Sequence, residues 1–275
     1  MAPSVAPPRP ARSNLRRALL AAACTFSFAP AARAAPPWVD RHLVLPRHDF
    51  AFDVGLGVGH VDFFDDDRTG VGLNLEGAVG ITEHLELGFR TGARFGDEGR
   101  LTRADEYARL WDTDTYNVGN DTFANPEARL RYGFLRGDVV ELGLEARFYL
   151  PITNGSEFGF APGLPVMVHF GDVARLDTGV LVPIVFTNDT TTIVSFPARL
   201  WFQASQRLWL GPISGVRIVN GPGGGSDTQV PLGFGLGYQI SSAVDLKTQF
   251  LFADVEGGEP TNAFGASFGL QFRIE

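Results

Sequence analysis

Apolar and polar residues alternate along most of this chain, and the alternation is longest in residues 126–152. Leu130 and Tyr132 fall on one side of an extended segment, whereas Arg129 and Arg131 fall on the other. After a short turn the same pattern restarts. Because successive side chains of a strand point to opposite faces, this segment predicts a long β-hairpin with one apolar and one charged face.

The hairpin unit recurs from residue 50 to the end of the chain and predicts an all-β fold of about twelve strands. Most of these strands are about ten residues long, which is the length that crosses a bilayer when the strand is tilted. The predicted strands are residues 50–58, 71–81, 85–95, 126–134, 140–152, 160–170, 176–186, 192–203, 208–219, 229–240, 244–253 and 263–274.

The connections between these strands alternate in length. Short turns are expected near residues 82–84, 136–138, 171–175, 204–207 and 241–243. Longer connections, rich in Gly, Asp and Asn, are expected near residues 60–70, 96–122, 153–159, 187–191, 220–228 and 254–262. Short turns at one end and long loops at the other are typical of an antiparallel up-and-down transmembrane β-barrel. An even number of strands places both termini at the short-turn, periplasmic end.

The same alternation occurs in soluble barrels with the faces exchanged, so the direction of the apolar face has to be decided separately. Inverting this sheet would enclose a large set of Phe and Leu side chains. Glycine also concentrates on the polar face, as at Gly55, Gly57, Gly233 and Gly235. Glycine is a poor strand former, but in a confined lumen it leaves space. The apolar face is therefore expected to meet lipid.

Composition narrows the function classes. The chain has 275 residues, including 33 Gly and 23 Phe, and its formal net charge of −8 argues against nucleic acid as a partner. Beyond the N-terminal region it has no apolar run long enough for a membrane helix. Its single cysteine, Cys24, cannot form an intramolecular disulfide.

Residues 1–34 have the parts of a secretory signal peptide: basic residues, an apolar run and the small-x-small site Ala32-Arg33-Ala34. Cleavage there would leave a chain with a formal charge of about −13. Acylation of Cys24 is the alternative. Residues 35–49 are a Pro-rich segment expected in the periplasm or inside the lumen, and residues 50–275 form the barrel.

The last strand, GASFGLQFRI, resembles the C-terminal signal strand of Gram-negative outer-membrane β-barrels of the porin-like superfamily, although it continues to Ile274 and Glu275 after Phe272. The segments NPEARLRYGF and ARFYLPI also resemble the transporter barrels associated with meta-pathway phenol degradation. The resemblance implies a location in the cell outer membrane. It also implies contact with lipid and lipopolysaccharide, and recognition of the last strand by the barrel-assembly machinery.

Charged residues of both signs occupy the polar face of the second to fifth strands. They either line the path of a solute or neutralise one another across neighbouring strands. His169, Trp201 and Trp209 share the same phase on later strands. The candidate lumen-lining residues are Glu76, Glu86, Arg90, Arg94, Glu127, Arg129, Arg131, Glu141, Glu145, Arg147, His169, Trp201 and Trp209.

On the sixth to ninth strands the inward phase is more apolar and contains several prolines. Because proline removes a ladder hydrogen bond, these strands indicate either bulges or a weakened stretch of sheet. A lumen with one charged and one apolar wall would suit an amphipathic or apolar solute, which could leave sideways through such a stretch. The residues concerned include Met167, Leu181, Val185, Ile213, Pro165, Pro183, Pro197 and Pro231.

No metal site, catalytic residue or cofactor is expected. The acidic group Asp62, Asp65, Asp66 and Asp67 lacks calcium-loop spacing and is predicted to be a solvated loop tip. No serine lies in a G-x-S-x-G setting. Sequence separation does not exclude spatial proximity, however, so an outer-membrane hydrolase remains one hypothesis.

The function predicted from the sequence is a porin-like channel or transporter for a small solute. Residues 35–49 or the loop 96–122 are the segments expected to fold inward as a constriction. The alternatives are a closed structural or adhesive barrel packed by its own charges, and the barrel hydrolase. Conductance separates the first two hypotheses.

Overall fold

The computed structural model describes residues 36–63, 66–96, 123–152, 158–186, 191–220, 225–256, 261 and 263–274. Residues Ala34–Glu275 form one compact unit, which contains every strand of the sheet. The predicted signal peptide and most of the predicted loop 96–122 lie outside the described residues. No helix within the described residues is long and apolar enough to cross a membrane.

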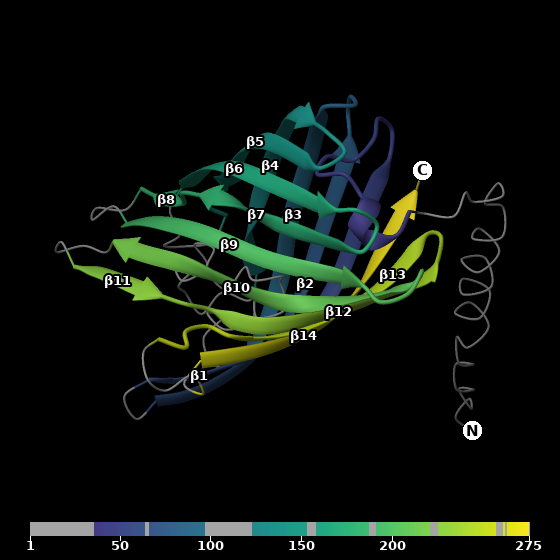
Figure 1. Ribbon diagram of the computed structural model, residues 1–275. Helices are drawn as coiled ribbons and strands as arrows, with labels where there is room; N and C mark the ends of the chain where they lie inside the picture. The colour runs from purple at the N-terminus through teal and green to yellow at the C-terminus, as the bar shows by residue number, and fades with distance from the viewer. Residues whose placement is uncertain are drawn as a thin grey trace, which may run out of the picture. The chain divides into compact units, whose positions relative to one another are not determined.

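Fourteen β-strands and one short 3-10 helix make up the described structure (Figure 1). The helix η2 (Trp38–Asp40) precedes all the strands. The strands are β1 (Phe50–Phe63), β2 (Asp66–Gly80), β3 (Leu85–Gly96), β4 (Phe123–Arg136), β5 (Val140–Tyr149), β6 (Gly159–Phe170), β7 (Ala174–Leu181), β8 (Ile184–Val185), β9 (Thr191–Gln203), β10 (Leu208–Asn220), β11 (Ser226–Gln229), β12 (Leu232–Ser241), β13 (Val244–Phe252) and β14 (Ala263–Ile274).

Every strand pairs antiparallel with its neighbours, and the sheet closes on itself. The first strand pairs with the last over twelve positions, from Phe50 opposite Ile274 to Val61 opposite Ala263. On the other side of the ring, β9 pairs with β10. Figure 1 shows the strands crossing obliquely around one axis. The predicted all-β antiparallel barrel is therefore confirmed.

The fourteen strands occupy twelve strand positions around the barrel, because two of these positions each hold two shorter strands separated by a break. β7 and β8 both pair with β6 and β9, and β11 pairs with β10 as β12 does. The interruptions fall at Pro183 and Pro231, two prolines that are fully buried. A proline has no N–H to donate to the hydrogen-bond ladder of the sheet. The sequence predicted one continuous strand at 176–186 and another at 229–240, and each is therefore broken into two.

The first hairpin is longer than predicted. Residues 60–70 were expected to form a loop, but β1 runs to Phe63 and β2 begins at Asp66, with Asp62 opposite Asp67. The acidic group is thus largely part of the hairpin. Asp65 and the side chains of Asp66 and Asp67 lie outside the described residues.

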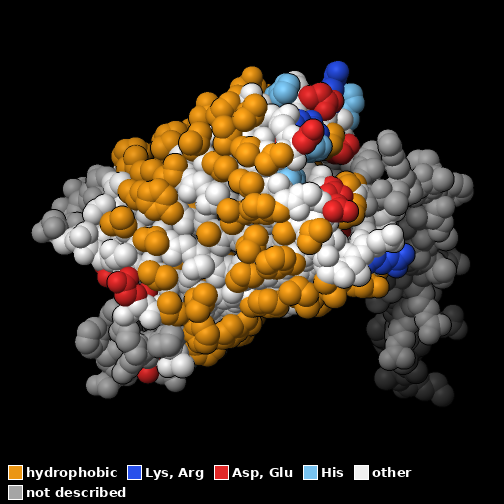
Figure 2. All heavy atoms as spheres, in the orientation of Figure 1, with side chains coloured by type: hydrophobic (Ala, Val, Ile, Leu, Met, Phe, Trp, Pro, Cys, Tyr) orange, Lys and Arg blue, Asp and Glu red, His pale blue; other side chains and the backbone are white. Residues whose placement is uncertain are grey.

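The apolar face of the sheet points out of the barrel. Leu144 is 54% exposed, whereas its neighbour Glu145 is 6% exposed. The same contrast separates Phe89, at 50%, from Arg90, at 3%. Figure 2 shows hydrophobic side chains spread over the outer surface of the strands, with charged side chains near their ends. A barrel in water would bury these residues, so this outer surface is suited to lipid.

We expect an outward charge at the middle of β5 to destabilise the barrel in lipid. Leu144→Arg should reduce the free energy of unfolding by about 2–4 kcal/mol, since a cation there must enter the hydrocarbon. Urea titration of the protein in lipid vesicles measures this change. Val139→Arg, at the short turn before β5, is the control and should cost at most about 1 kcal/mol. Equal losses for both variants would contradict a lipid-facing surface.

Candidate functional site

The interior of the barrel is lined by residues of the charged face, and a continuous ion-pair network covers β2 to β5. Arg129 is central, because its guanidinium lies 2.9 Å from Glu76 and 3.0 Å from Glu86. Cross-strand register brings these residues together, since Gly88 of β3 is opposite Arg129 of β4. The absence of a side chain at Gly88 leaves room for the long Arg129 side chain.

A second group of the same network surrounds Glu145. Its carboxylate accepts hydrogen bonds from Arg131 and Arg147, with ion-pair distances of 2.5 and 2.6 Å. Longer contacts of 3.7–3.9 Å join Arg131 to Glu86, Arg147 to Glu127, and Arg90 to Glu127. All eight residues were predicted from the alternation alone. Ion pairs with little exposure to water hold one another in place, because each charge left alone would be costly.

The chain itself enters the lumen before the first strand. A tight turn at residues 46–49 precedes β1, with the N–H of His48 donating to the carbonyl of Gly80 at 2.9 Å. A side chain at Gly80 would overlap the carbonyl oxygen of Pro46, so glycine is required for this approach. From the turn, residues 36–45, which we call the inner segment, contact inward-facing side chains of the barrel.

Carboxylates of the wall bind the backbone of the inner segment. The N–H of Leu43 donates to Glu141 at 3.0 Å, and the N–H of Leu45 donates to Glu86 at 3.0 Å. Arg131 donates to the carbonyl of Leu43, also at 3.0 Å. These contacts satisfy backbone groups that would otherwise be buried without partners.

Arg41 and Trp38 attach the inner segment to the opposite wall. Arg41 makes a two-pronged ion pair with Asp245, at 2.6 and 3.2 Å. Trp38 stacks on Trp209 with ring centroids 4.8 Å apart and planes within 1°. The guanidinium groups of Arg41 and Arg175 each lie 4.9 Å from the Trp38 ring, within cation–π range.

His169 contacts both the inner segment and the wall. Its Nδ1 lies 2.8 Å from the carbonyl oxygen of Val39, and its Nε2 lies 3.1 Å from a carboxylate oxygen of Glu141. The same oxygen is 2.8 Å from Nδ1 of His42. Carbonyl and carboxylate oxygens are acceptors, so a ring nitrogen of His169 that carries a proton donates to one of them.

The inner segment narrows the short-turn end of the barrel. Glu86, Glu141 and His169 each lie close to a short turn, as do Gln203 and Asp245. The N–H of Val39 donates to Gln203 at 3.3 Å. Because strands alternate in direction, these residues all lie at one end, the end that holds Phe50 and Ile274.

Thirteen residues were predicted to line the lumen, and their positions follow the predicted phase. Eight form the network of β2 to β5. Glu141 and His169 contact the inner segment, while Trp201 and Trp209 are 2% exposed and pack in an apolar cluster with Val39. Arg94 lies at an inward register position of β3, opposite Gly72, but its side chain lies outside the described residues. What these residues do for a solute remains a prediction.

The wall formed by the later strands is less apolar than predicted. Ile213, Trp201 and Trp209 do cluster there, yet charged residues alternate with them on the same and adjacent strands. These charged residues occupy the same alternate positions along their strands as the predicted residues do, so the period-two pattern would have identified them. The inward charges on strands that the sequence analysis did not select include Asp53, Arg175, Asp177, Arg217, Asp245, Lys247 and Arg273.

No group of three or more His, Cys, Asp or Glu within the described part of the chain is placed to hold a metal ion. No family model matches the chain, and no curated protein matches it.

Solved structures do resemble it. The NanC porin matches with a TM-score of 0.57 and 6% identity over 81% of this chain and 100% of that one. An outer-membrane channel from Pseudomonas putida F1 matches with a TM-score of 0.60 and 10% identity over 84% and 97%. This chain has the fold of the outer-membrane porin barrels. A KdgM porin in complex with disordered oligogalacturonate matches with a TM-score of 0.51 and 9% identity over 82% and 99%.

Glu145 is the strongest test of the ion-pair network. Glu145→Gln should reduce the free energy of unfolding by about 3–5 kcal/mol, because Arg131 and Arg147 would lose the charge that compensates theirs in a buried site. The matched control is Glu83→Gln, which breaks an exposed pair with Arg136 and should cost less than about 1 kcal/mol. Chemical unfolding in vesicles compares the two variants. A loss for Glu145→Gln as small as the control's would show that the network is solvated.

Proposed function

We propose that this protein is an outer-membrane channel through which small solutes pass passively along the lumen. The observation that carries this proposal is the combination of an exposed apolar outside with a charged inside in one closed barrel. Membrane insertion explains the outside, and a water-facing path explains why so many charges are kept inside. The shared fold with porins and with a channel supports the proposal.

The character of the lumen wall favours a polar solute over an apolar one. The apolar cluster of Trp201, Trp209 and Ile213 is covered by Val39 and Trp38 of the inner segment, so it offers little surface to an apolar solute. Charged residues and glycines occupy many inward positions of β1 to β5 and β14, although a second apolar cluster of Tyr149, Ala161 and Leu181 lies on β5 to β7. The KdgM porin is in complex with a disordered oligogalacturonate, a polar chain, which supports a polar solute for a barrel of this fold.

The inner segment is proposed to set the width of the periplasmic mouth. Its polar contacts come from several strands, including β3, β5, β6 and β13, and its apolar contacts come from β6, β9 and β10. Solutes would pass beside the segment or during its displacement. The predicted constriction by the loop 96–122 lies largely outside the described residues and stays a prediction.

A closed structural barrel is the second candidate. The same paired charges and the same inner segment would also fill a lumen that nothing crosses, as the sequence analysis allowed. Single-channel recording in planar bilayers separates the two candidates. A stable ion conductance supports the channel, whereas a silent membrane with folded protein inserted supports the structural barrel.

A disulfide can test whether the inner segment controls passage. A Cβ placed on Gly133 would lie 3.9 Å from the Cβ of Val44, which is within the range for a disulfide. The variant Val44→Cys with Gly133→Cys, carrying Ala in place of Cys24, should conduct less when oxidised and recover with reductant. Conductance measured before and after reduction checks this expectation.

The matched control is Val44→Cys alone in the same Cys24→Ala background, which should not respond to reductant. An oxidised double variant that conducts like the reduced one would mean that the segment stays in place while solutes pass. The segment would then be a fixed constriction and not a gate.

Cleavage of the signal peptide, contact with lipopolysaccharide and recognition of β14 by the assembly machinery are part of the same proposal. The exposed aromatic and aliphatic residues of β14, including Phe268 and Ile274, are compatible with such recognition.

A further inference from the structure

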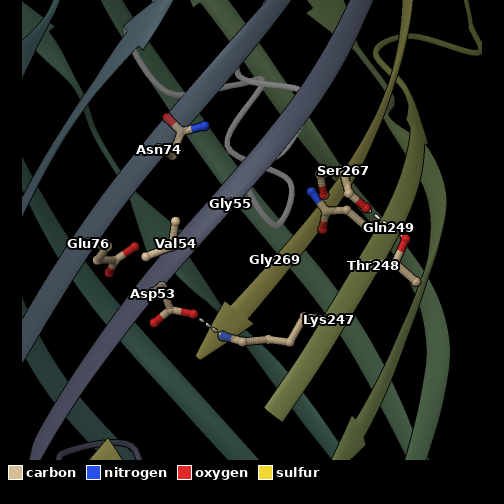
Figure 3. A pocket seen from close by; sticks show the side chains of 10 residues that line it. All are labelled: Asp53, Val54, Gly55, Asn74, Glu76, Lys247, Thr248, Gln249, Ser267 and Gly269. Carbon is tan, nitrogen blue, oxygen red and sulfur yellow. Dashed lines mark hydrogen bonds and ion pairs between the residues drawn. The ribbon is translucent and has the colours of Figure 1, made fainter. Parts of the chain in front are cut away.

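A pocket lined mainly by polar residues, with glycines at its centre, lies in the lumen wall formed by β13, β14, β1 and β2 (Figure 3). Strand register places Gly269 beside Gly55, and Gly55 beside Asn74. In the next inward row, Ser267 lies beside Gly57, which lies beside Gly72. The middle of this wall therefore carries no side chains, and a solute could approach the backbone there.

Polar side chains surround these central glycines. Figure 3 shows Asn74 on one side of β1 and Gln249 with Ser267 on the other. Asp53, Glu76 and Lys247 line the same pocket. The rim thus offers carboxylate, amide, hydroxyl and ammonium groups within one pocket.

The charges of the rim are already compensated. Lys247 lies 2.5 Å from Asp53, which also accepts a hydrogen bond from Gln271 at 2.8 Å. Glu76 is paired with Arg129 at 2.9 Å. An ion entering the pocket would have to compete with these pairs, so the pocket favours a ligand without net charge.

Asn74 supplies an independent sign of a missing ligand. The residue is 7% exposed, and its amide nitrogen Nδ2 has no hydrogen-bond partner within the described part of the chain. A buried donor without an acceptor costs free energy, and native proteins seldom retain one without a reason. Its neighbours at the same level on both adjacent strands, Gly55 and Gly92, have no side chain that could accept from it.

We propose that this pocket is a binding site for a small neutral solute rich in hydroxyl groups, such as a polyol or monosaccharide. This inference rests on the proposed channel function and specifies its solute. A hydroxyl group both donates and accepts, so it can bind the Asn74 donor and the acceptors of Asp53 or Glu76 together. An apolar solute would leave these groups unpaired and would be rejected.

The test uses the full-length protein, folded in detergent and in liposomes. Saturation-transfer NMR with glucose and glycerol measures binding without requiring flux, and liposome swelling with the same two probes measures passage. Asn74→Leu removes the amide at similar volume and should weaken both signals about three- to tenfold.

Ser267→Ala, at the far rim, should weaken glucose binding in the same direction. Its matched control is Ser195→Ala, a buried inward serine of β9 that lies outside this pocket and should have no effect. Glucose binding that is equal in wild type, Asn74→Leu and Ser267→Ala would overturn the site, even if ions pass. Glucose binding that is lost in these variants, in a barrel that conducts nothing, would keep the site and refute the channel.

Discussion

The structure depends on the requirement that every backbone N–H and C=O inside a membrane has a partner within the protein. An open sheet would leave two edges without partners, so the strands must close into a ring. In this barrel the closure joins β1 to β14 over twelve residue pairs, which brings the two ends of the barrel sequence together. Once the ring is closed, one set of alternating residues must face lipid and the other set must face the enclosed lumen.

The confinement of these residues in the lumen explains how the charged side chains inside the barrel are arranged. A charge in the lumen has limited access to water, so it is stable only beside an opposite charge or a hydrogen-bonding group. Glu76, Arg129 and Glu86 satisfy one another across three strands. Glu141 and Asp245 instead bind the inner segment, through Leu43 and Arg41. The constriction and the charged wall therefore result from the same need for partners.

The sequence was sufficient for the fold and for the network on β2 to β5, because both follow from a period of two. The sequence was insufficient for the contacts of the inner segment, because residues outside the strands have no periodic spacing. Nothing in the pattern relates Arg41 to Asp245, which is 204 residues away, or places Trp38 against Trp209. The inward prolines were expected to cause bulges or a weakened stretch of sheet, and the structure shows strand breaks at Pro183 and Pro231, where proline cannot donate to the ladder.

The distribution of side-chain size divides the lumen into two unlike sides. On β3 to β5 long Arg and Glu side chains reach across the wall and bind one another, whereas on β14, β1 and β2 glycine is the most frequent residue of the same phase. Glycine weakens a strand by roughly 0.5–1 kcal/mol relative to alanine, so a row of glycines needs a compensating reason. In the proposed channel, space for a solute beside the strands is such a reason, and the path would then run along the first and last strands.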